Sequence, residues 1–143
     1  MASASTTATF NCPADEFFKL ISDYEKYPEF LTEVKDVKIL KTSGSTKEME
    51  YSVSLIKSSK YKLKVEEKAP TLIQFHFIGG DVFKTMKGSW DIKPKGEKCE
   101  VIYSVEASFG MLIPDSIAKP LVSANLPMMI ENIKKRIKKV YGK

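Results

Sequence analysis

The sequence is poor in the side chains that most often build metal sites and nucleophilic catalytic centres. Its 143 residues include one histidine, His76, and two cysteines, Cys12 and Cys99. A single histidine cannot supply the paired ligands of a common zinc site, and no serine or cysteine has a histidine partner at a supporting spacing. The sequence therefore predicts no catalytic residue, no metal site and no cofactor, and it favours a binding protein over an enzyme.

The few histidine and cysteine residues have simpler explanations. His76 is expected on the solvent-facing side of a strand. Cys12 and Cys99 stand far apart in the chain, without the spacing of metal ligands, beside or within predicted strands. Buried free thiols are the expected state of both cysteines.

Long apolar runs are also missing, and residues 1–10 contain no basic region followed by an apolar stretch. The sequence therefore predicts neither a transmembrane segment nor a secretory signal peptide, and we expect a cytoplasmic protein. Hydrophobic residues make up 43% of the chain and charged residues 29%, which is typical of a soluble globular protein. The length predicts one domain over residues 1–143.

The net charge of +5 is distributed unevenly. Arg136, the only arginine, stands in a basic tail with four lysines, namely Lys134, Lys135, Lys138 and Lys139. A solvated helix face explains such a cluster in most proteins. The alternative is a contact with a ribosome or RNA through these four lysines.

Residues 114–141 form the only long segment with helical periodicity. From residue 126 onward, apolar side chains recur every three or four positions, at Leu126, Met129, Ile130, Ile133, Ile137 and Val140. Pro120 and Pro127 each remove a backbone donor, so we expect the helix to kink or split near them.

Shorter elements precede this helix. A first strand is predicted over residues 6–12, and Pro13 then opens a helix whose core face carries Phe17, Leu20, Ile21 and Tyr24. Pro28 is expected to start a second short helix carrying Phe30 and Leu31.

Alternating apolar and polar residues predict further strands over 34–42, 48–55, 60–66, 72–78, 82–92 and 99–109. Turns are expected at 42–46, 57–60, 79–81 and 93–98, which are rich in glycine, proline or small polar residues. The predicted fold class is α+β: a curved antiparallel sheet of six or seven strands wrapped around a long kinked C-terminal helix, with two short helices after the first strand.

This order of elements resembles the helix-grip fold of the START-like or birch-allergen-like (SRPBCC) superfamily, and within it the polyketide cyclase and coenzyme-Q-binding branch. The resemblance covers nearly the whole chain, and three stretches carry it: DYEKYPEFLTEVKDVKIL at 23–40, GGDVFKTMKGSWDIKP at 79–94 and EVIYSVEASFGMLIP at 100–114.

The resemblance implies an apolar cavity between the concave sheet face and the helix. The residues expected to line it are Tyr51, Val53, Leu63, Phe75, Met86, Trp90, Tyr103 and Val105 from the sheet, Leu121 and Val122 from the helix, and Tyr27 and Leu31 at the mouth. Gly88 is expected to leave the sheet uncovered beside Trp90. Possible polar contacts are Tyr51, Tyr61, Tyr103 and Ser104. The alternative is that these side chains pack against one another and leave no cavity.

These expectations favour a protein that binds a hydrophobic small molecule, such as a quinone, an isoprenoid or a lipid, for transport or chaperoning and without transforming it. Two alternatives remain open. One is an enzyme similar to a polyketide cyclase or dehydratase, and the other is a ribosome-associated protein similar to the ribosome-association toxins of this branch.

Overall fold

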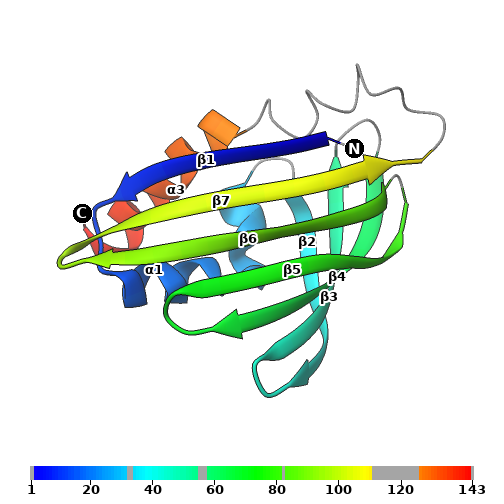
Figure 1. Cartoon of the computed structure of the whole chain (residues 1–143), viewed down its shortest axis with the longest axis horizontal. Coiled ribbons are helices and arrows are strands. Elements are labelled where there is room, and N and C mark those ends of the chain that lie inside the picture. Colours follow the sequence, from blue (N-terminus) through cyan, green and yellow to red (C-terminus); the bar gives the residue numbers. More distant parts are fainter. Residues whose placement is uncertain (1, 32–33, 55–57, 82, 111–125, 143) are drawn as a thin grey trace.

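A computed structural model describes residues 2–31, 34–54, 58–81, 83–110 and 126–142 (Figure 1). Its strands are β1 (Ala2–Phe10), β2 (Val34–Ser43), β3 (Thr46–Ser54), β4 (Ser58–Lys68), β5 (Leu72–Gly80), β6 (Phe83–Lys95) and β7 (Lys98–Phe109). Its helices are α1 (Ala14–Ile21), the 3₁₀ helix η1 (Tyr24–Glu29) and α3 (Leu126–Tyr141). Residues 114–125 of the predicted helix, with Pro120, Leu121 and Val122, lie outside the described residues.

The seven strands form one antiparallel sheet in the order β1-β7-β6-β5-β4-β3-β2. Successive strands from β2 to β7 are neighbours, and β1 returns to pair with β7 over its whole length. The helices α1 and α3 lie on one side of this sheet, where α1 contacts β6 and β7 and α3 contacts β1 (Figure 1). The predicted helix-grip α+β fold is therefore confirmed.

The sheet is strongly curved, and irregular strand pairing contributes to this curvature. One extra residue interrupts the register near Lys35 and Leu40 in β2, Ile78 in β5 and Lys84 in β6. Bulges of this kind bend a strand and increase its twist. Two of the extra residues, Leu40 and Ile78, are large apolar side chains that are 52% and 43% exposed, because a bulge breaks the alternation between the two sheet faces.

The second short helix differs from its prediction. Pro28 does not start it, because η1 begins at Tyr24 and contains Pro28, and Phe30 follows its end. A 3₁₀ helix has three residues per turn, so Tyr24 and Tyr27 share one face, and both are buried. The burial of these two rings explains why the helix starts earlier than the proline suggests.

Several strands also differ in length from their predictions. β1 runs from residue 2 to 10 instead of 6–12, β5 continues through Gly80, and β6 continues through Pro94 to Lys95. Partner strands explain the extensions, since Gly80 pairs with Tyr61 and Pro94 pairs with Cys99. Residues that usually form turns thus become part of a strand where a neighbouring strand can pair with them.

The two cysteines lie together in the core, although they are far apart in the sequence. Both are free and buried, as predicted. A hydrogen bond between the Cys99 and Cys12 side chains is the main cause that raises the pKa of Cys99, and burial of the thiol is the second cause. The Cys99 thiol therefore stays protonated, and both buried cysteines act as small apolar core residues.

Gly88 is not uncovered. Its cross-strand neighbour Phe75 lies over it, so that a Cβ atom built on Gly88 would overlap with Phe75 Cζ and come within 2.5 Å of the Ser104 carbonyl oxygen. The expectation of open space beside Trp90 at this position is therefore wrong. The aromatic ring of Phe75 packs where the glycine has no side chain.

We expect Gly88→Ala to lower the free energy of unfolding by roughly 1–3 kcal/mol, because the new methyl group must displace both the Phe75 ring and a backbone oxygen. Gly79→Ala is the matched control, since a Cβ at Gly79 meets no atom within 4 Å. Urea denaturation of the two variants measures the difference. Equal stability of the two variants would contradict the close packing of Phe75 on Gly88.

Candidate ligand-binding cavity

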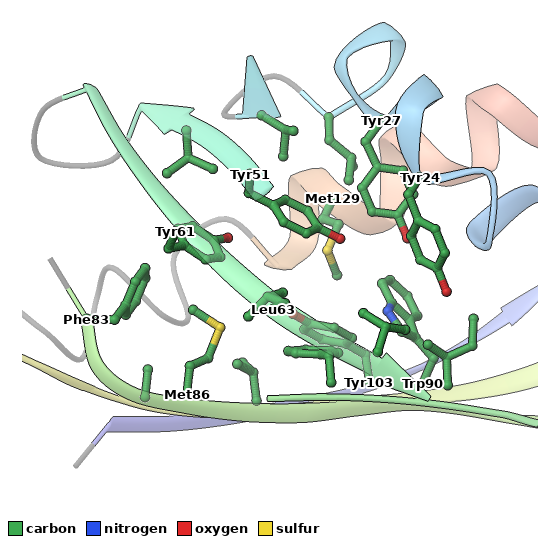
Figure 2. Close-up of a pocket in the computed structure, with 18 of the residues that line it drawn as sticks. Tyr24, Tyr27, Tyr51, Tyr61, Leu63, Phe83, Met86, Trp90, Tyr103 and Met129 are labelled. Atoms are coloured by element: carbon green, nitrogen blue, oxygen red, sulfur yellow. The ribbon is translucent and has the colours of Figure 1, made fainter. Parts of the chain in front are cut away.

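A cavity of about 170 Å³ lies between the inner face of the sheet and the helices (Figure 2). An apolar cavity of about 150 Å³ is large enough to hold a benzene molecule. The lining consists mostly of aliphatic and aromatic side chains from η1, from strands β2 to β7 and from the first turn of α3. The enclosed volume therefore matches about one six-membered ring.

The cavity brings together the predicted site residues that the structure describes. These are Tyr27, Leu31, Tyr51, Val53, Leu63, Phe75, Met86, Trp90, Tyr103 and Val105. Most of them also belong to the buried core cluster, so the same side chains pack against one another and surround a cavity. Leu121 and Val122 lie outside the described residues, and the role of the whole set in binding a ligand stays a prediction.

Several lining residues were not predicted from the sequence: Tyr24, Val34, Val65, Ile73, Phe83, Ala107, Phe109, Leu126 and Met129. Tyr61 was predicted only as a possible polar contact, and it does line the cavity. Alternation along β4, β5 and β7 places some of these on the same face as predicted residues and could have identified them. Tyr24 had a weaker signal, because its helical spacing from Phe17 indicates core packing and not a cavity wall.

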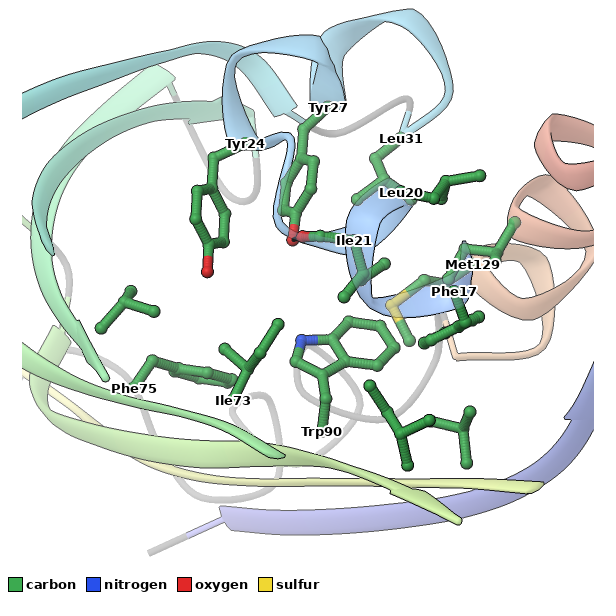
Figure 3. Packing of buried hydrophobic residues seen from close by; sticks show 14 of the residues in the cluster. Phe17, Leu20, Ile21, Tyr24, Tyr27, Leu31, Ile73, Phe75, Trp90 and Met129 are labelled. Carbon is green, nitrogen blue, oxygen red and sulfur yellow. Dashed lines mark hydrogen bonds between the residues drawn. The ribbon is translucent and has the colours of Figure 1, made fainter. Parts of the chain in front are cut away.

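Aromatic rings form a nearly continuous wall. Tyr51 stacks on Tyr61 with ring centroids 5.4 Å apart, and Tyr61 meets Phe83 edge to face at 5.1 Å. On the other side of the cavity, Trp90 contacts Tyr103 at 4.4 Å and Phe17 of α1 at 6.2 Å (Figure 3). These contacts join α1 and the sheet around the cavity, and each is of the kind that adds about 0.5–1.5 kcal/mol beyond area burial.

One end of the cavity is polar. The Tyr24 hydroxyl donates to Glu67 Oε2 at 2.6 Å, and Lys47 Nζ pairs with Glu67 Oε1 at 2.8 Å. The Tyr27 hydroxyl donates to the carbonyl oxygen of Ile21. The side chains of Lys47 and Glu67 are 21% and 13% exposed, so this ion pair lies at the border between the cavity and solvent.

Three tyrosines of the cavity are held in the neutral form. Burial is the main cause that raises the pKa of Tyr24, Tyr27 and Tyr51, and the hydrogen bond to Glu67 raises the pKa of Tyr24 further. A hydroxyl whose pKa is raised in this way is a poor general base near neutral pH. These groups are therefore suited to hydrogen bonding with a ligand.

Ser104, considered from the sequence as a polar contact, and His76, considered for catalysis, both lie away from the cavity. Ser104 occupies the outer sheet face, opposite Tyr103, and its hydroxyl is 3.2 Å from the Ser5 hydroxyl of β1. Alternation along β7 explains the error of taking Ser104 as a polar contact in the cavity. His76 is exposed on β5, as predicted. Among the described residues, no three His, Cys, Asp or Glu side chains gather as metal ligands do.

Arg136 differs from the lysines of the basic tail. Its side chain is 12% exposed, and it pairs with Glu29 at 3.0 Å and lies 5.3 Å from the centre of the Phe30 ring. The hydrogen bond from Arg136 lowers the pKa of Glu29. Arg136 thus connects α3 to the η1 segment beside the cavity, whereas Lys134, Lys135, Lys138 and Lys139 are exposed.

None of the helices that the structure describes is long and apolar enough to cross a lipid bilayer.

Comparison with solved structures defines the class of fold. A START superfamily protein from Mycobacterium smegmatis superimposes with a TM-score of 0.88, at 20% identity, over 98% of this chain and 99% of that one. The Zhui aromatase/cyclase from Streptomyces sp. R1128 superimposes with a TM-score of 0.71, at 16% identity, over 94% of this chain and 84% of that one. The chain thus has a START-like fold, as predicted.

Sequence comparison identifies the family. A sequence model of the family described as "Polyketide cyclase / dehydrase and lipid transport" matches residues 10–134, and the chain belongs to this family. A curated relative, the ribosome association toxin RatA of Vibrio cholerae, is 26% identical over 144 residues that cover 99% of each chain.

Tyrosine ionisation offers a test of the buried cavity wall. The pKa of Tyr24, Tyr27 and Tyr51 is raised above the ordinary value of 10.0, so their stabilising contribution is complete below about pH 10 and is lost as pH rises beyond that value. We expect their tyrosinate absorbance to appear only together with alkaline unfolding, measured by circular dichroism. Ionisation of all six tyrosines near pH 10 in a folded protein would contradict this burial.

Proposed function

We propose that this protein binds a hydrophobic small molecule, such as a quinone, an isoprenoid or a lipid, in the cavity and does not transform it. The observation that carries the proposal is an apolar cavity of about 170 Å³ in which the hydroxyls of Tyr24 and Tyr27 already donate to groups of the protein. Family membership supports it, because the family description includes lipid transport.

The size of the cavity limits what is enclosed. A ring or the end of a chain fits within about 170 Å³, and a longer ligand would extend toward the mouth. Burial of about 200 Å² of apolar ligand surface would contribute roughly 5 kcal/mol before ordering costs. This energy is enough for reversible binding, and specificity then depends on the few polar atoms of the wall.

A titration with p-xylene tests binding directly. Trp90, the only tryptophan, lines the cavity, so its emission should change on binding, at low and at high salt alike, because apolar burial is not screened. Native mass spectrometry of freshly purified protein should also detect a co-purified apolar molecule. A Trp90 emission unaffected by p-xylene and by representative quinones, isoprenoids and lipids would overturn the proposal.

Filling the cavity provides a second test. Met86 lines the cavity, and Figure 2 shows its side chain pointing into it. Met86→Trp should weaken p-xylene binding at least about tenfold, at a stability cost of roughly 1–3 kcal/mol from overpacking. Isothermal titration calorimetry and thermal denaturation measure the two effects.

Lys87→Trp is the matched control, because Lys87 is the next residue of β6 and faces the other side of the sheet. Its ion pair with Glu106 is exposed, with a distance of 3.6 Å, and exposed pairs contribute little to stability. The control should therefore bind p-xylene like the unmodified protein. Equal affinities in the two tryptophan variants would argue that p-xylene binds elsewhere.

Ribosome association is a second candidate function, favoured by the curated relatives named as ribosome association toxins and by the exposed lysines of α3. In this case binding should fall steeply with salt concentration. The cyclase alternative has less support, because the neutral tyrosines of the cavity are poorly suited to proton transfer.

Charge reversal distinguishes a binding surface from a solvated helix face. Changing Lys134, Lys135, Lys138 and Lys139 to Glu should abolish co-sedimentation with ribosomes if this surface binds them. The cost to helix stability should be a few tenths of a kcal/mol for each substitution, since the new anions oppose the helix dipole. Retained p-xylene affinity would show that the cavity is intact.

The control for charge reversal has the same net charge as the α3 variant, but its four substitutions lie on the sheet. Lys38, Lys41, Lys60 and Lys62 are exposed on β2 and β4, and changing them to Glu alters the net charge by the same amount. Loss of co-sedimentation in both variants would indicate a nonspecific charge effect. Undiminished co-sedimentation of the α3 variant would exclude its lysines as the ribosome contact.

A further inference from the structure

Three polar groups meet at one end of the cavity. Figures 2 and 3 show the hydroxyls of Tyr24 and Tyr27 and the indole nitrogen of Trp90 pointing toward the same part of it. All three residues line the cavity, and each is at most 5% exposed. They come from η1 and β6, which only the tertiary structure brings together.

The tyrosine hydroxyls can only accept a further hydrogen bond. Each has a single proton, and Tyr24 donates it to Glu67 while Tyr27 donates it to the carbonyl oxygen of Ile21. A carbonyl oxygen cannot donate, and Glu67 is a carboxylate paired with Lys47 at 2.8 Å, so neither partner can reverse the bond. The lone pairs of both tyrosine oxygens remain available to a ligand.

The indole N–H of Trp90 has the opposite role, because it can donate a hydrogen bond but cannot accept one. The same end of the cavity therefore presents one donor and two acceptors. A hydroxyl group, which both donates and accepts, can satisfy the two kinds of partner at once. A carbonyl, ether or nitrile satisfies only the donor, and a hydrocarbon satisfies neither.

We propose that the cavity selects compact apolar molecules that carry a hydroxyl group, such as phenols and alcohols, with the ligand hydroxyl accepting from Trp90 Nε1 and donating to Tyr24 or Tyr27. This inference rests on the proposed binding function and specifies its ligand class. Within the ligand classes named above, an isoprenoid that carries an alcohol group meets both requirements, and so does the quinol form of a quinone, whereas the quinone itself meets one.

Three probes of similar shape test the proposal: p-cresol donates and accepts, 4-methylbenzonitrile only accepts, and p-xylene does neither. Their dissociation constants are measured by isothermal titration calorimetry on the full chain. A neutral hydrogen bond corresponds to a roughly two- to tenfold change in affinity. Because the probes differ in hydration, the informative quantity is how their affinity ratios change between variants.

Removing the acceptors should affect p-cresol alone. In Tyr24→Phe, and more strongly in the double variant Tyr24→Phe/Tyr27→Phe, p-cresol should bind about two- to tenfold more weakly while p-xylene binds as before. Tyr141→Phe is the matched control. The Tyr141 hydroxyl donates to the Glu16 carbonyl oxygen at 3.0 Å, and Tyr141 does not line the cavity.

Glu67→Met provides an independent variant in which both tyrosines are retained. Loss of the carboxylate releases the Tyr24 proton, so this hydroxyl becomes able to donate into the cavity. The affinity for 4-methylbenzonitrile should then rise about two- to tenfold. If circular dichroism shows that the double tyrosine variant does not fold, the Glu67→Met variant still tests the hydroxyl preference.

The outcomes separate this proposal from the binding function itself. If none of the three probes binds to the folded protein but a quinone, isoprenoid or lipid does, only this proposal fails. If no molecule of either set binds, both proposals fail. If the probes bind but the ratio of p-cresol to p-xylene affinity is the same in the tyrosine variants, only the hydroxyl preference is overturned. An unchanged affinity of the Glu67→Met variant for 4-methylbenzonitrile would also overturn the hydroxyl preference.

Discussion

The curvature of the antiparallel sheet is the constraint on which the rest of the molecule depends. Extra residues in β2, β5 and β6 bend the strands, so the flat packing of one helix against one sheet is impossible. The helices α1, η1 and α3 cover the concave face, and large side chains such as Trp90 and Tyr51 bridge the separation. A cavity of about 170 Å³ remains where even these rings do not meet.

Buried tyrosines are the second consequence of this arrangement. The helix η1 covers the concave face of the sheet and buries Tyr24 and Tyr27 there, and each buried hydroxyl then requires a partner. Tyr24 and Tyr27 find theirs within the protein, at Glu67 and the Ile21 carbonyl oxygen. Because these bonds exist before any ligand enters, the orientation of both hydroxyls is set by the fold, and ligand binding need not reorganise them.

The cations of the C-terminal helix have two different roles. Arg136 is largely covered, and it holds α3 against η1 through Glu29 and Phe30. The neighbouring lysines Lys135 and Lys138 are exposed, and exposed charges of this kind mainly solvate a helix face. A single basic run in the sequence thus divides into one structural contact beside the cavity and a surface available to partners.

The sequence by itself determined the order of the elements, the identity of the inward sheet face and most of the apolar stripe of α3, because periods of two and about four residues depend only on local backbone geometry. The stripe was wrong at Val140, which is 50% exposed in the last turn of α3. From these periodicities and the family resemblance, Tyr51, Trp90 and Tyr103 could be assigned to the concave face. Helix boundary signals were less reliable: the helical spacing placed Tyr24 on the core face of the first helix, whereas α1 ends at Ile21 and the buried Tyr24 begins η1.

Only the tertiary structure decided which distant residues meet. The contact of Phe75 with Gly88, the pair of Cys12 and Cys99 and the bond from Tyr24 to Glu67 each join segments that the sequence separates. Such contacts depend on sheet register and on bulges, where one extra residue moves every following side chain to the other face. For this reason the composition of the wall could be predicted, whereas the hydrogen-bonding polarity of the cavity required the folded chain.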